Sequence, residues 1–128
     1  MRLLLDTHAL LWWLDGDRRL SRTARSRLAD EDNVVLVSAA SAWEITTKAR
    51  RGRLPGALPV AEDVAGAVAS QGFTALDITI QHAQRAGRLP GDHRDPFDRM
   101  LIAQAQLEDV PIVSNETVFD GYGVTRVW

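Results

Sequence analysis

The sequence of 128 residues carries a formal net charge of −2 and contains no cysteine. A chain of this length can bury about two thirds of its unfolded surface without crosslinks, so we expect a single domain spanning residues 1–128. The absence of cysteine excludes zinc–thiolate sites, disulfide redox chemistry and cysteine nucleophiles, and the small net charge argues against binding of nucleic acid by bulk electrostatics.

The N-terminal segment lacks the uninterrupted apolar core of a signal peptide or membrane span, because Asp6 and His8 break it. We therefore expect a soluble, cytoplasmic protein that makes no contact with a membrane. The basic residues are almost all arginine and gather in three clusters, at residues 18–27, 48–53 and 85–99. Each cluster is explained most simply as a solvated helix face, and any binding of nucleic acid would have to use such a local patch.

Short apolar runs alternate with helical patterns along the chain. The sequence predicts, in order, a strand at residues 2–6, helices at 7–14 and 21–30, a strand at 34–37, a helix from 38 to 52, a helix at 61–70, a strand at 74–76, a helix ending near 87, a helix at 96–108, a strand at 110–114 and an edge strand at 123–127. Strands that alternate with helices require right-handed crossovers, which produce a mostly parallel sheet covered on both faces. We therefore expect an α/β fold, built as a three-layer α/β/α sandwich.

The segment from His93 to Arg99 places two carboxylates in the first turn of a predicted helix. Asp95 is a good N-cap residue, and Pro96 suits the first helical position, where its missing N–H has no intrahelical partner to lose. Asp98 follows three residues later, where an acid can reach back to the N–H of the cap residue. The two acids therefore either cap this helix or hold a metal ion.

Other acids follow the predicted strands. In open α/β sheets ligands bind beyond the carboxyl ends of the strands, so acids at those ends are candidates for one site. They are Asp6 after the first strand, Glu44 on the helix after the second strand, Asp95 and Asp98 at the start of the long helix, and Glu116 after the strand that ends at Ser114. If they converge, each pair about 4 Å apart repels by about 4 kcal/mol at an effective dielectric near 20, so the cluster requires a cation or raised pKa values.

Each acid also has a purely structural interpretation. Asp6 can cap the helix that begins at Thr7, Glu44 can pair with Lys48 four residues later, and Glu116 can lie in a surface loop. If these acids do bind a metal, their oxygen ligands favour Mg²⁺ or Mn²⁺ over zinc. The histidines His8 and His93 lie near the predicted edge without forming a spaced ligand pair, which favours a supporting or surface role.

Four segments of the chain resemble a known family. They are LLLDTHALLW at residues 3–12, VSAASAWEI at 37–45, HRDPFDRMLIAQA at 93–105 and SNE at 114–116. Their content and order resemble PIN-domain proteins, and specifically the VapC-type toxins of type II toxin–antitoxin pairs. The resemblance runs nearly end to end.

The resemblance implies an Mg²⁺- or Mn²⁺-dependent endoribonuclease. Such an enzyme cleaves RNA, often tRNA or rRNA in relatives, with a metal-activated water, and stops translation and growth until a VapB-like antitoxin blocks it. Relatives commonly form homodimers. The RNA target, the cleavage site, the antitoxin and the number of metals are not specified by the sequence.

The family's site residues carry over by position. Asp6, Glu44 and Asp98 match its metal-site acids, Asp95 matches an acid of this subgroup, and Thr7 and Ser114 match its hydroxyl positions. The family usually has Asp where this chain has Glu116, beside Asn115, so Glu116 could bind the metal directly, through water or at a second metal. Arg94 and Arg99 are the arginines nearest to these acids in the sequence, and their guanidinium groups fit phosphate oxygens. Trp12, Trp13 and Trp43 could stack bases or form an antitoxin groove, although we expect at least two of them in the core.

Two other functional classes are excluded by the sequence. A phosphoacceptor receiver domain needs an aspartate after a mid-chain strand and a late lysine, but Val34–Val37 ends at Ser38 and Lys48 is the only lysine. A phosphatase with Asp-x-Asp after the first strand is excluded because His8 occupies the second position. A PIN fold that binds only protein partners, with its metal site disabled by Glu116, remains the alternative.

Overall fold

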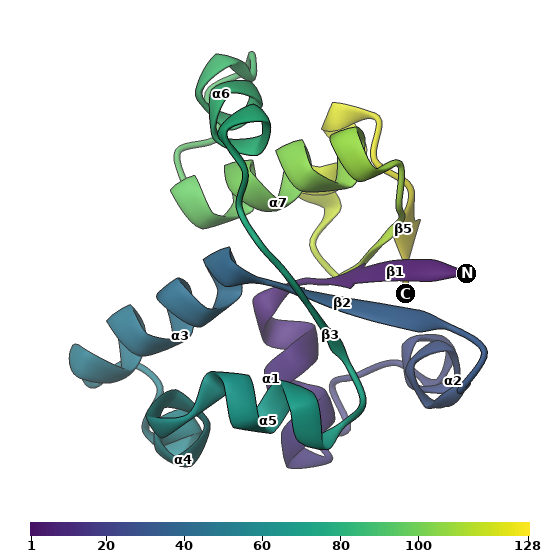
Figure 1. The fold of residues 1–128 in the computed structure, drawn as a ribbon, viewed down its shortest axis with the longest axis vertical. Helices are drawn as coiled ribbons and strands as arrows, with labels where there is room; N and C mark the ends of the chain where they lie inside the picture. Colours follow the sequence, from purple (N-terminus) through teal and green to yellow (C-terminus); the bar gives the residue numbers. More distant parts are fainter.

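The computed structural model describes residues 1–128 and contains a five-stranded sheet with the order β3-β2-β1-β4-β5 (Figure 1). The strands are β1 (Arg2–Leu5), β2 (Val34–Ser38), β3 (Thr74–Leu76), β4 (Ile112–Val113) and β5 (Arg126–Val127). Every adjacent pair is parallel. The chain starts in the middle of the sheet, adds β2 and β3 on one side and then returns to add β4 and β5 on the other.

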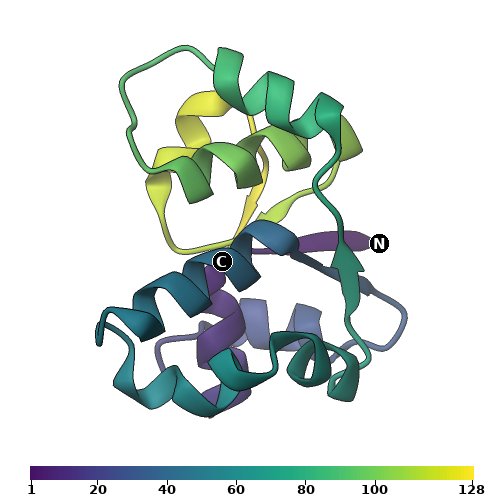
Figure 2. The ribbon, with the colours of Figure 1, turned by 60° about the vertical axis from the view of Figure 1, so that its left-hand side comes forward.

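Helices cover both faces of this sheet. They are α1 (Thr7–Asp15), α2 (Arg22–Ala29), α3 (Ala39–Arg50), α4 (Leu58–Glu62), α5 (Val64–Ser70), α6 (Ile80–Arg88) and α7 (Pro96–Glu108), with short 3-10 helices η1 (Pro55–Ala57) and η2 (Thr117–Tyr122). The helices α6 and α7 lie on one face, whereas α1, α2, α4 and α5 lie on the other, and a second view shows the same layers (Figure 2). The predicted three-layer α/β/α sandwich is therefore confirmed.

The alternation of side chains along β1 divides the core in two. Leu3 and Leu5 pack into a cluster with α1, α2 and α3, whereas Leu4 packs with Leu101 and Ile102 of α7 on the other face. Burial of each leucine contributes about 1.5–3 kcal/mol, which explains why this central strand is apolar on both faces. The apolar run ends at Leu5 because the next residue, Asp6, lies beyond the carboxyl end of β1.

The structure differs from the predicted elements in a split helix, in shorter strands β4 and β5 and in two 3-10 helices that were not predicted. The helix expected at 61–70 is split at Asp63, whose carboxylate accepts a hydrogen bond from the Gly66 N–H at 2.9 Å and so caps a new helix, α5. Pattern alone did not reveal this break, because an aspartate inside a helical pattern can equally point to solvent. The sequence also predicted no element at Thr117–Tyr122, where η2 forms.

The tryptophans are less buried than expected. Trp12 and Trp13, both on α1, are half-buried and pack against the core cluster that contains Leu3 and Leu5. Trp43 is 61% exposed and contacts Phe97 edge-on, with ring centroids 4.9 Å apart. The expectation that at least two would lie in the core is therefore met only in part.

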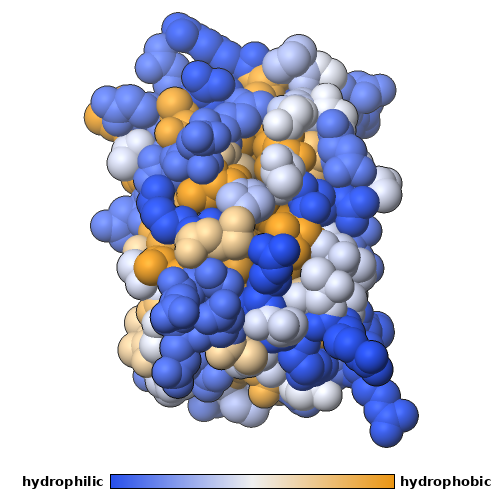
Figure 3. Space-filling view, turned by 90° about the vertical axis from the view of Figure 1, so that its right-hand side faces the viewer, coloured by the Kyte–Doolittle hydropathy of each residue, from blue (hydrophilic) through white to orange (hydrophobic).

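The two ends of the parallel strands lie beside different kinds of side chain. Figure 3 looks at the side where β1 begins, and hydrophobic side chains show across the middle of this face with hydrophilic ones around them. The candidate acids follow the opposite, carboxyl ends of the strands, where Asp6 donates its N–H to the Val113 carbonyl at 3.1 Å. None of the helices combines the length and the apolar character needed to cross a membrane.

Candidate metal centre

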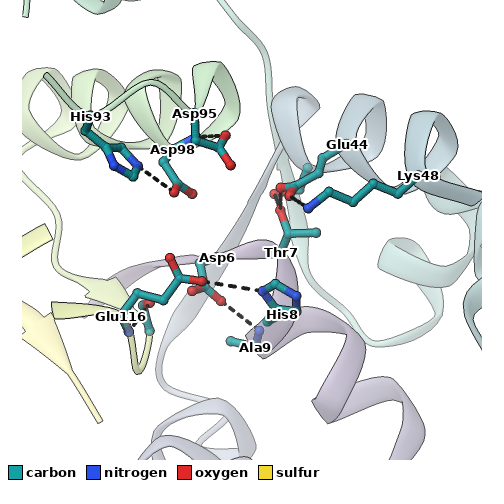
Figure 4. A network of polar contacts seen from close by, with 12 residues as sticks. Asp6, Thr7, His8, Ala9, Glu44, Lys48, His93, Asp95, Asp98 and Glu116 are labelled. Carbon is teal, nitrogen blue, oxygen red and sulfur yellow. Dashed lines mark hydrogen bonds and ion pairs between the residues drawn. The ribbon is translucent and has the colours of Figure 1, made fainter. Parts of the chain in front are cut away.

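Asp6 enters the site because it is both the residue after β1 and the N-cap of α1. Its Oδ1 atom accepts a hydrogen bond from the Ala9 N–H at 2.7 Å, as the structural interpretation predicted. The side chain is 4% exposed, and Figure 4 shows its carboxylate beside that of Glu116. Capping therefore fixes the Asp6 carboxylate at the carboxyl edge of the sheet and does not withdraw it from the site.

Asp95 and Asp98 have separate roles at the start of α7. Asp95 Oδ1 accepts hydrogen bonds from the N–H groups of Phe97 and Asp98, at 2.9 and 3.1 Å, and caps the helix. The expected return bond from Asp98 to the cap residue is absent, because Asp98 Oδ2 instead lies 2.9 Å from His93 Nε2. Asp98 is thereby turned toward the other acids, as Figure 4 shows.

Glu44 is buried on α3, the helix capped by the Ser38 hydroxyl, which accepts from the Ala40 N–H at 3.0 Å. The Thr7 hydroxyl donates to Glu44 Oε1 at 2.6 Å, and Lys48 Nζ lies 2.5 Å from Oε2. The predicted pair between Glu44 and Lys48 is confirmed. Both carboxylate oxygens of Glu44 are therefore held by donors from this chain.

Glu116 follows β4 after a short turn. Its backbone N–H donates to the Ser114 hydroxyl at 2.9 Å, and its Oε1 atom lies 3.6 Å from His8 Nδ1. Glu116 lies in the loop between β4 and η2 and its side chain is 37% exposed, so it remains partly accessible to solvent, as expected of a loop residue. Because β4 lies next to β1 on the side opposite β2, Glu116 approaches Asp6 from the β4 side.

Four carboxylates from four segments consequently face one space: Asp6, Glu44, Asp98 and Glu116 (Figure 4). We call them the carboxylate site. Burial raises the pKa of Asp98 to about 6, and the charges of Asp95, Glu116 and Glu44 add to this effect, while the His93 contact opposes it. Burial also raises the pKa of Asp6 to about 6, supported by Glu116 and opposed by the Ser114 and Ala9 hydrogen bonds. The site therefore favours any ligand that removes negative charge.

The carboxylate site fits a hard divalent cation in its donor type and its charge. All of its candidate ligands are carboxylate oxygens, which suit Mg²⁺ or Mn²⁺. No three acidic or histidine side chains lie close enough together, as arranged here, to enclose one ion. Instead His93, Lys48 and His8 each contact one of the acids. Binding a cation therefore requires some of these side chains to exchange an internal partner for the ion.

The remaining predicted site residues differ in their burial and in their hydrogen-bond partners. Thr7 and Ser114 are buried within the site, whereas Asn115 and Arg94 are exposed beside it. The Arg99 guanidinium donates to the carbonyls of His93, at 3.0 Å, and Leu89. As arranged, Arg99 therefore holds the loop before α7, and Arg94 is the freer of the two arginines.

Ser41 is a buried residue that contacts the site but was not predicted from the sequence. Its hydroxyl lies 3.0 Å from that of Thr7, which in turn donates to Glu44. The signal was available, because Ser41 precedes Glu44 by three residues and so lies on the same face of the helix. The supporting role expected of His8 and His93 agrees with their contacts to Glu116 and Asp98.

Comparison with solved structures relates this fold to toxin–antitoxin complexes. The chain is similar to one in the VapBC2 complex from Rickettsia felis, bound to a promoter DNA fragment, with a TM-score of 0.70 and 13% identity over 98% of this chain and 97% of that chain. It is similar to one in DNA-bound VapBC from Salmonella typhimurium, with a TM-score of 0.69 and 18% identity over 98% and 96% of the two chains. VapC20 from Mycobacterium tuberculosis, described as a toxin that cleaves the sarcin–ricin loop, gives a TM-score of 0.66 and 18% identity over 96% of both chains.

The family is established by the sequence. A search of curated proteins finds no relative, but a sequence model described as the PIN domain matches residues 3–124. At the identities above, the solved structures establish the shared fold alone. Because the match covers nearly the whole chain, from the start of β1 to the residues before β5, this protein belongs to the PIN domain family.

Proposed function

We propose that this protein is a divalent-metal-dependent endoribonuclease and the toxin of a type II toxin–antitoxin pair. The observation that carries this proposal is the carboxylate site, where Asp6 and Asp98 have pKa values raised to about 6 at the carboxyl edge of a PIN fold. The similar structures support it, because they include VapBC complexes and a toxin described as cleaving the sarcin–ricin loop.

The metal would be Mg²⁺ or Mn²⁺, held by Asp6, Glu44 and Asp98, with Glu116 at the border of the site. When bound, it supplies a water of lowered pKa and neutralises charge on the phosphate oxygens. Asp95 contributes by starting α7, since its oxygen accepts two backbone N–H groups and so sets the position of Asp98.

The remaining side chains orient the acids and balance their charge. The Thr7 hydroxyl fixes Glu44 at 2.6 Å, and Ser41 lies behind Thr7 at 3.0 Å. Lys48 and His93 partner Glu44 and Asp98 as the site is arranged here. These contacts limit the repulsion among the carboxylates, and Arg94 is exposed where it can contact a phosphate of the substrate.

The partners of this proposal are RNA, a VapB-like antitoxin and a second copy of the toxin, in the cytoplasm. The VapBC complexes among the similar structures support the antitoxin. Expression of the chain alone should arrest growth, and expression with the small DNA-binding protein of a neighbouring gene should restore it. Size-exclusion chromatography with light scattering measures whether the purified toxin is a dimer.

Cleavage of RNA tests the enzyme directly. Purified protein is mixed with structured RNA in the presence of Mg²⁺, Mn²⁺ or a chelator, and the new RNA ends are mapped. Cuts that require the metal and disappear with Asp6→Asn support the nuclease. Intact RNA under all conditions, together with tight binding of the antitoxin, would leave the binding-only PIN module as the function.

A further inference from the structure

A polar cavity lies outside the carboxylate site, between α6, the second half of α7 and the end of η2. Its volume is about 630 Å³. The polar side chains that line it are Gln81, Gln84, Arg85, Arg88, Gln106 and Tyr122. We call this cavity the arginine groove.

The two arginines of the groove are held by neutral amides. Arg85 Nη1 donates to Gln106 Oε1 at 3.2 Å, and both Nη atoms of Arg88 lie 2.9 and 3.0 Å from the amide oxygen of Gln84 in the orientation that satisfies both groups. Neither guanidinium forms a salt bridge, in contrast to Arg126, which pairs with Asp120. The positive charge of the groove is therefore oriented by hydrogen bonds but not cancelled by a carboxylate.

The chemistry of the groove fits an anion that also offers hydrogen-bonding groups. Arg85 and Arg88 are three residues apart on α6 and share a face of that helix. No acidic residue lines the cavity, and its apolar lining is limited to Leu89, Pro90 and Leu107. Guanidinium groups fit the oxygens of phosphate, while amide and phenol groups can bond to bases or sugars. An apolar peptide segment would find few anchors here.

Two short chain segments connect the groove to the carboxylate site. In the first segment, Pro90 lines the groove and His93, three residues later, contacts Asp98. Three residues of chain span at most about 11 Å, so the groove and Asp98 are close along this segment. In the second segment, η2 begins directly after Glu116 and ends at Tyr122, whose carbonyl accepts from Gln106 Nε2 at 3.0 Å. The groove and the site therefore lie near enough to each other for one nucleic-acid strand to reach both.

We propose that the arginine groove binds backbone phosphates of the RNA strand that flanks the scissile phosphate. This proposal rests on the proposed nuclease function and adds to it a second contact region on the same substrate. The groove contributes binding affinity and fixes the position of the RNA strand, whereas the carboxylate site performs the cleavage. Contacts to phosphate position a nucleic acid without reading its sequence, so the groove should act on many RNA sequences alike.

The test measures RNA binding separately from cleavage. The double variant Arg85→Gln/Arg88→Gln is compared with the wild type for binding of a short single-stranded RNA in a chelator, across a series of salt concentrations. We expect affinity to fall by at least about tenfold at low salt, and the slope of log affinity against log salt to decrease by about 1.4, which corresponds to two phosphate contacts. In metal-dependent cleavage of the same RNA, KM should rise by a similar factor with little change in kcat.

A matched control separates the groove from the total charge. Arg18→Gln/Arg22→Gln removes the same number of charges at the first residue of α2 and in the segment before it, and both residues are exposed. Equal losses in the two double variants would show a bulk electrostatic effect and overturn the proposal. So would unchanged RNA affinity in the groove variant, or a loss confined to binding of the antitoxin. If the wild type binds RNA through the groove without cutting it, the nuclease proposal fails while the groove remains an RNA site.

Discussion

The carboxylate site and the arginine groove lie at the two ends of the loop between α6 and α7. They differ in the sign of their charged groups and in how those charges are compensated. The site gathers negative groups, and three of its four carboxylates each contact a basic side chain, such as His93 on Asp98 or Lys48 on Glu44. The groove gathers positive groups and orients them with neutral glutamines.

This difference indicates how each region receives its ligand. In the site a ligand must displace internal partners, so binding is coupled to the protonation of the acids and to movement of their side chains. In the groove the guanidinium groups are already oriented and uncompensated, so binding should depend mainly on salt. Substitutions in the site should therefore change cleavage and the response of stability to metal and pH, whereas substitutions in the groove should change the dependence of RNA binding on salt.

The largest effect is expected for Asp6→Asn and Asp98→Asn. Each substitution removes a negative charge from the site, while the asparagine side chain keeps nearly the same shape as the aspartate that it replaces. Because loss of a group that merely orients a metal ligand already costs about 10- to 100-fold in activity, we expect cleavage of RNA to fall by at least about 100-fold. Single-turnover cleavage in Mg²⁺ measures this loss.

Asp92→Asn is the matched control for these variants. Asp92 is an exposed acid in the same loop as His93, and its side chain makes no hydrogen bond or ion pair. Its substitution should leave cleavage within about twofold of the wild type. Equal losses for Asp92→Asn and Asp98→Asn would mean that charge near the site matters in general, and would contradict a specific ligand role for Asp98.

Metal binding should also stabilise the fold. At a Mg²⁺ concentration of 100 times its Kd, the free energy of unfolding should increase by about 2.7 kcal/mol, or roughly 10 °C in Tm for a chain of this size. Thermal unfolding with Mg²⁺ and with a chelator measures this shift. Asp98→Asn should lose most of it, whereas the groove variant Arg85→Gln/Arg88→Gln should retain it. A shift that survives in Asp98→Asn would place the metal elsewhere.

The pH dependence of the metal-free protein provides a related test. The pKa values of Asp6 and Asp98 are raised from 3.8 to about 6 in the folded protein, which means that the folded state binds these protons more tightly than the unfolded chain. Their stabilising effect is therefore complete below about pH 4 and is lost as the pH rises through 6.

Each of the two carboxyl groups accounts for up to about 3 kcal/mol of this loss, and Asp98 for less because it is partly open to solvent. Urea denaturation at pH 5 and pH 7.5 in a chelator measures the change. Asp6→Asn and Asp98→Asn should each reduce the difference between the two pH values. Metal-dependent cleavage should show the reverse trend and decline below pH 6, since protons then compete with the cation.

Much of the fold and part of the site follow from local sequence. The apolar run Leu3–Leu5 and the polar Asp6 predicted a buried strand with a candidate site acid at its end, because a fully buried strand must be apolar on both faces. The Asp95–Pro96 pair predicted the start of α7 from capping chemistry alone. These signals lie within a few residues of each other, so the sequence carries them directly.

Contacts between distant segments could not be obtained in this way. No local pattern indicates that Gln106 of α7 meets Arg85 of α6, since that contact depends on how the two helices pack. Likewise Thr7 and Glu44 are 37 residues apart and meet only because β1 and β2 are adjacent. The arginine groove was therefore visible in the sequence only as part of a cluster of basic residues.

The smallest effect is expected for Asp95→Ala, which tests whether position and charge are separable within the carboxylate site. Asp95 caps α7 through two backbone N–H groups, so its loss should cost about 1 kcal/mol of stability, or about 3–6 °C in Tm. Below that lower Tm, cleavage should persist within about tenfold of the wild type, because Asp98 still faces the other acids. Thermal unfolding and cleavage at about 20 °C below each Tm measure the two effects. Asp98→Asn should show the opposite pattern, with activity lost and the metal-free fold no less stable at pH 7.5. If both variants lowered Tm and activity to the same degree, Asp95 and Asp98 would share one role, and the separation of helix cap from metal ligand would be wrong.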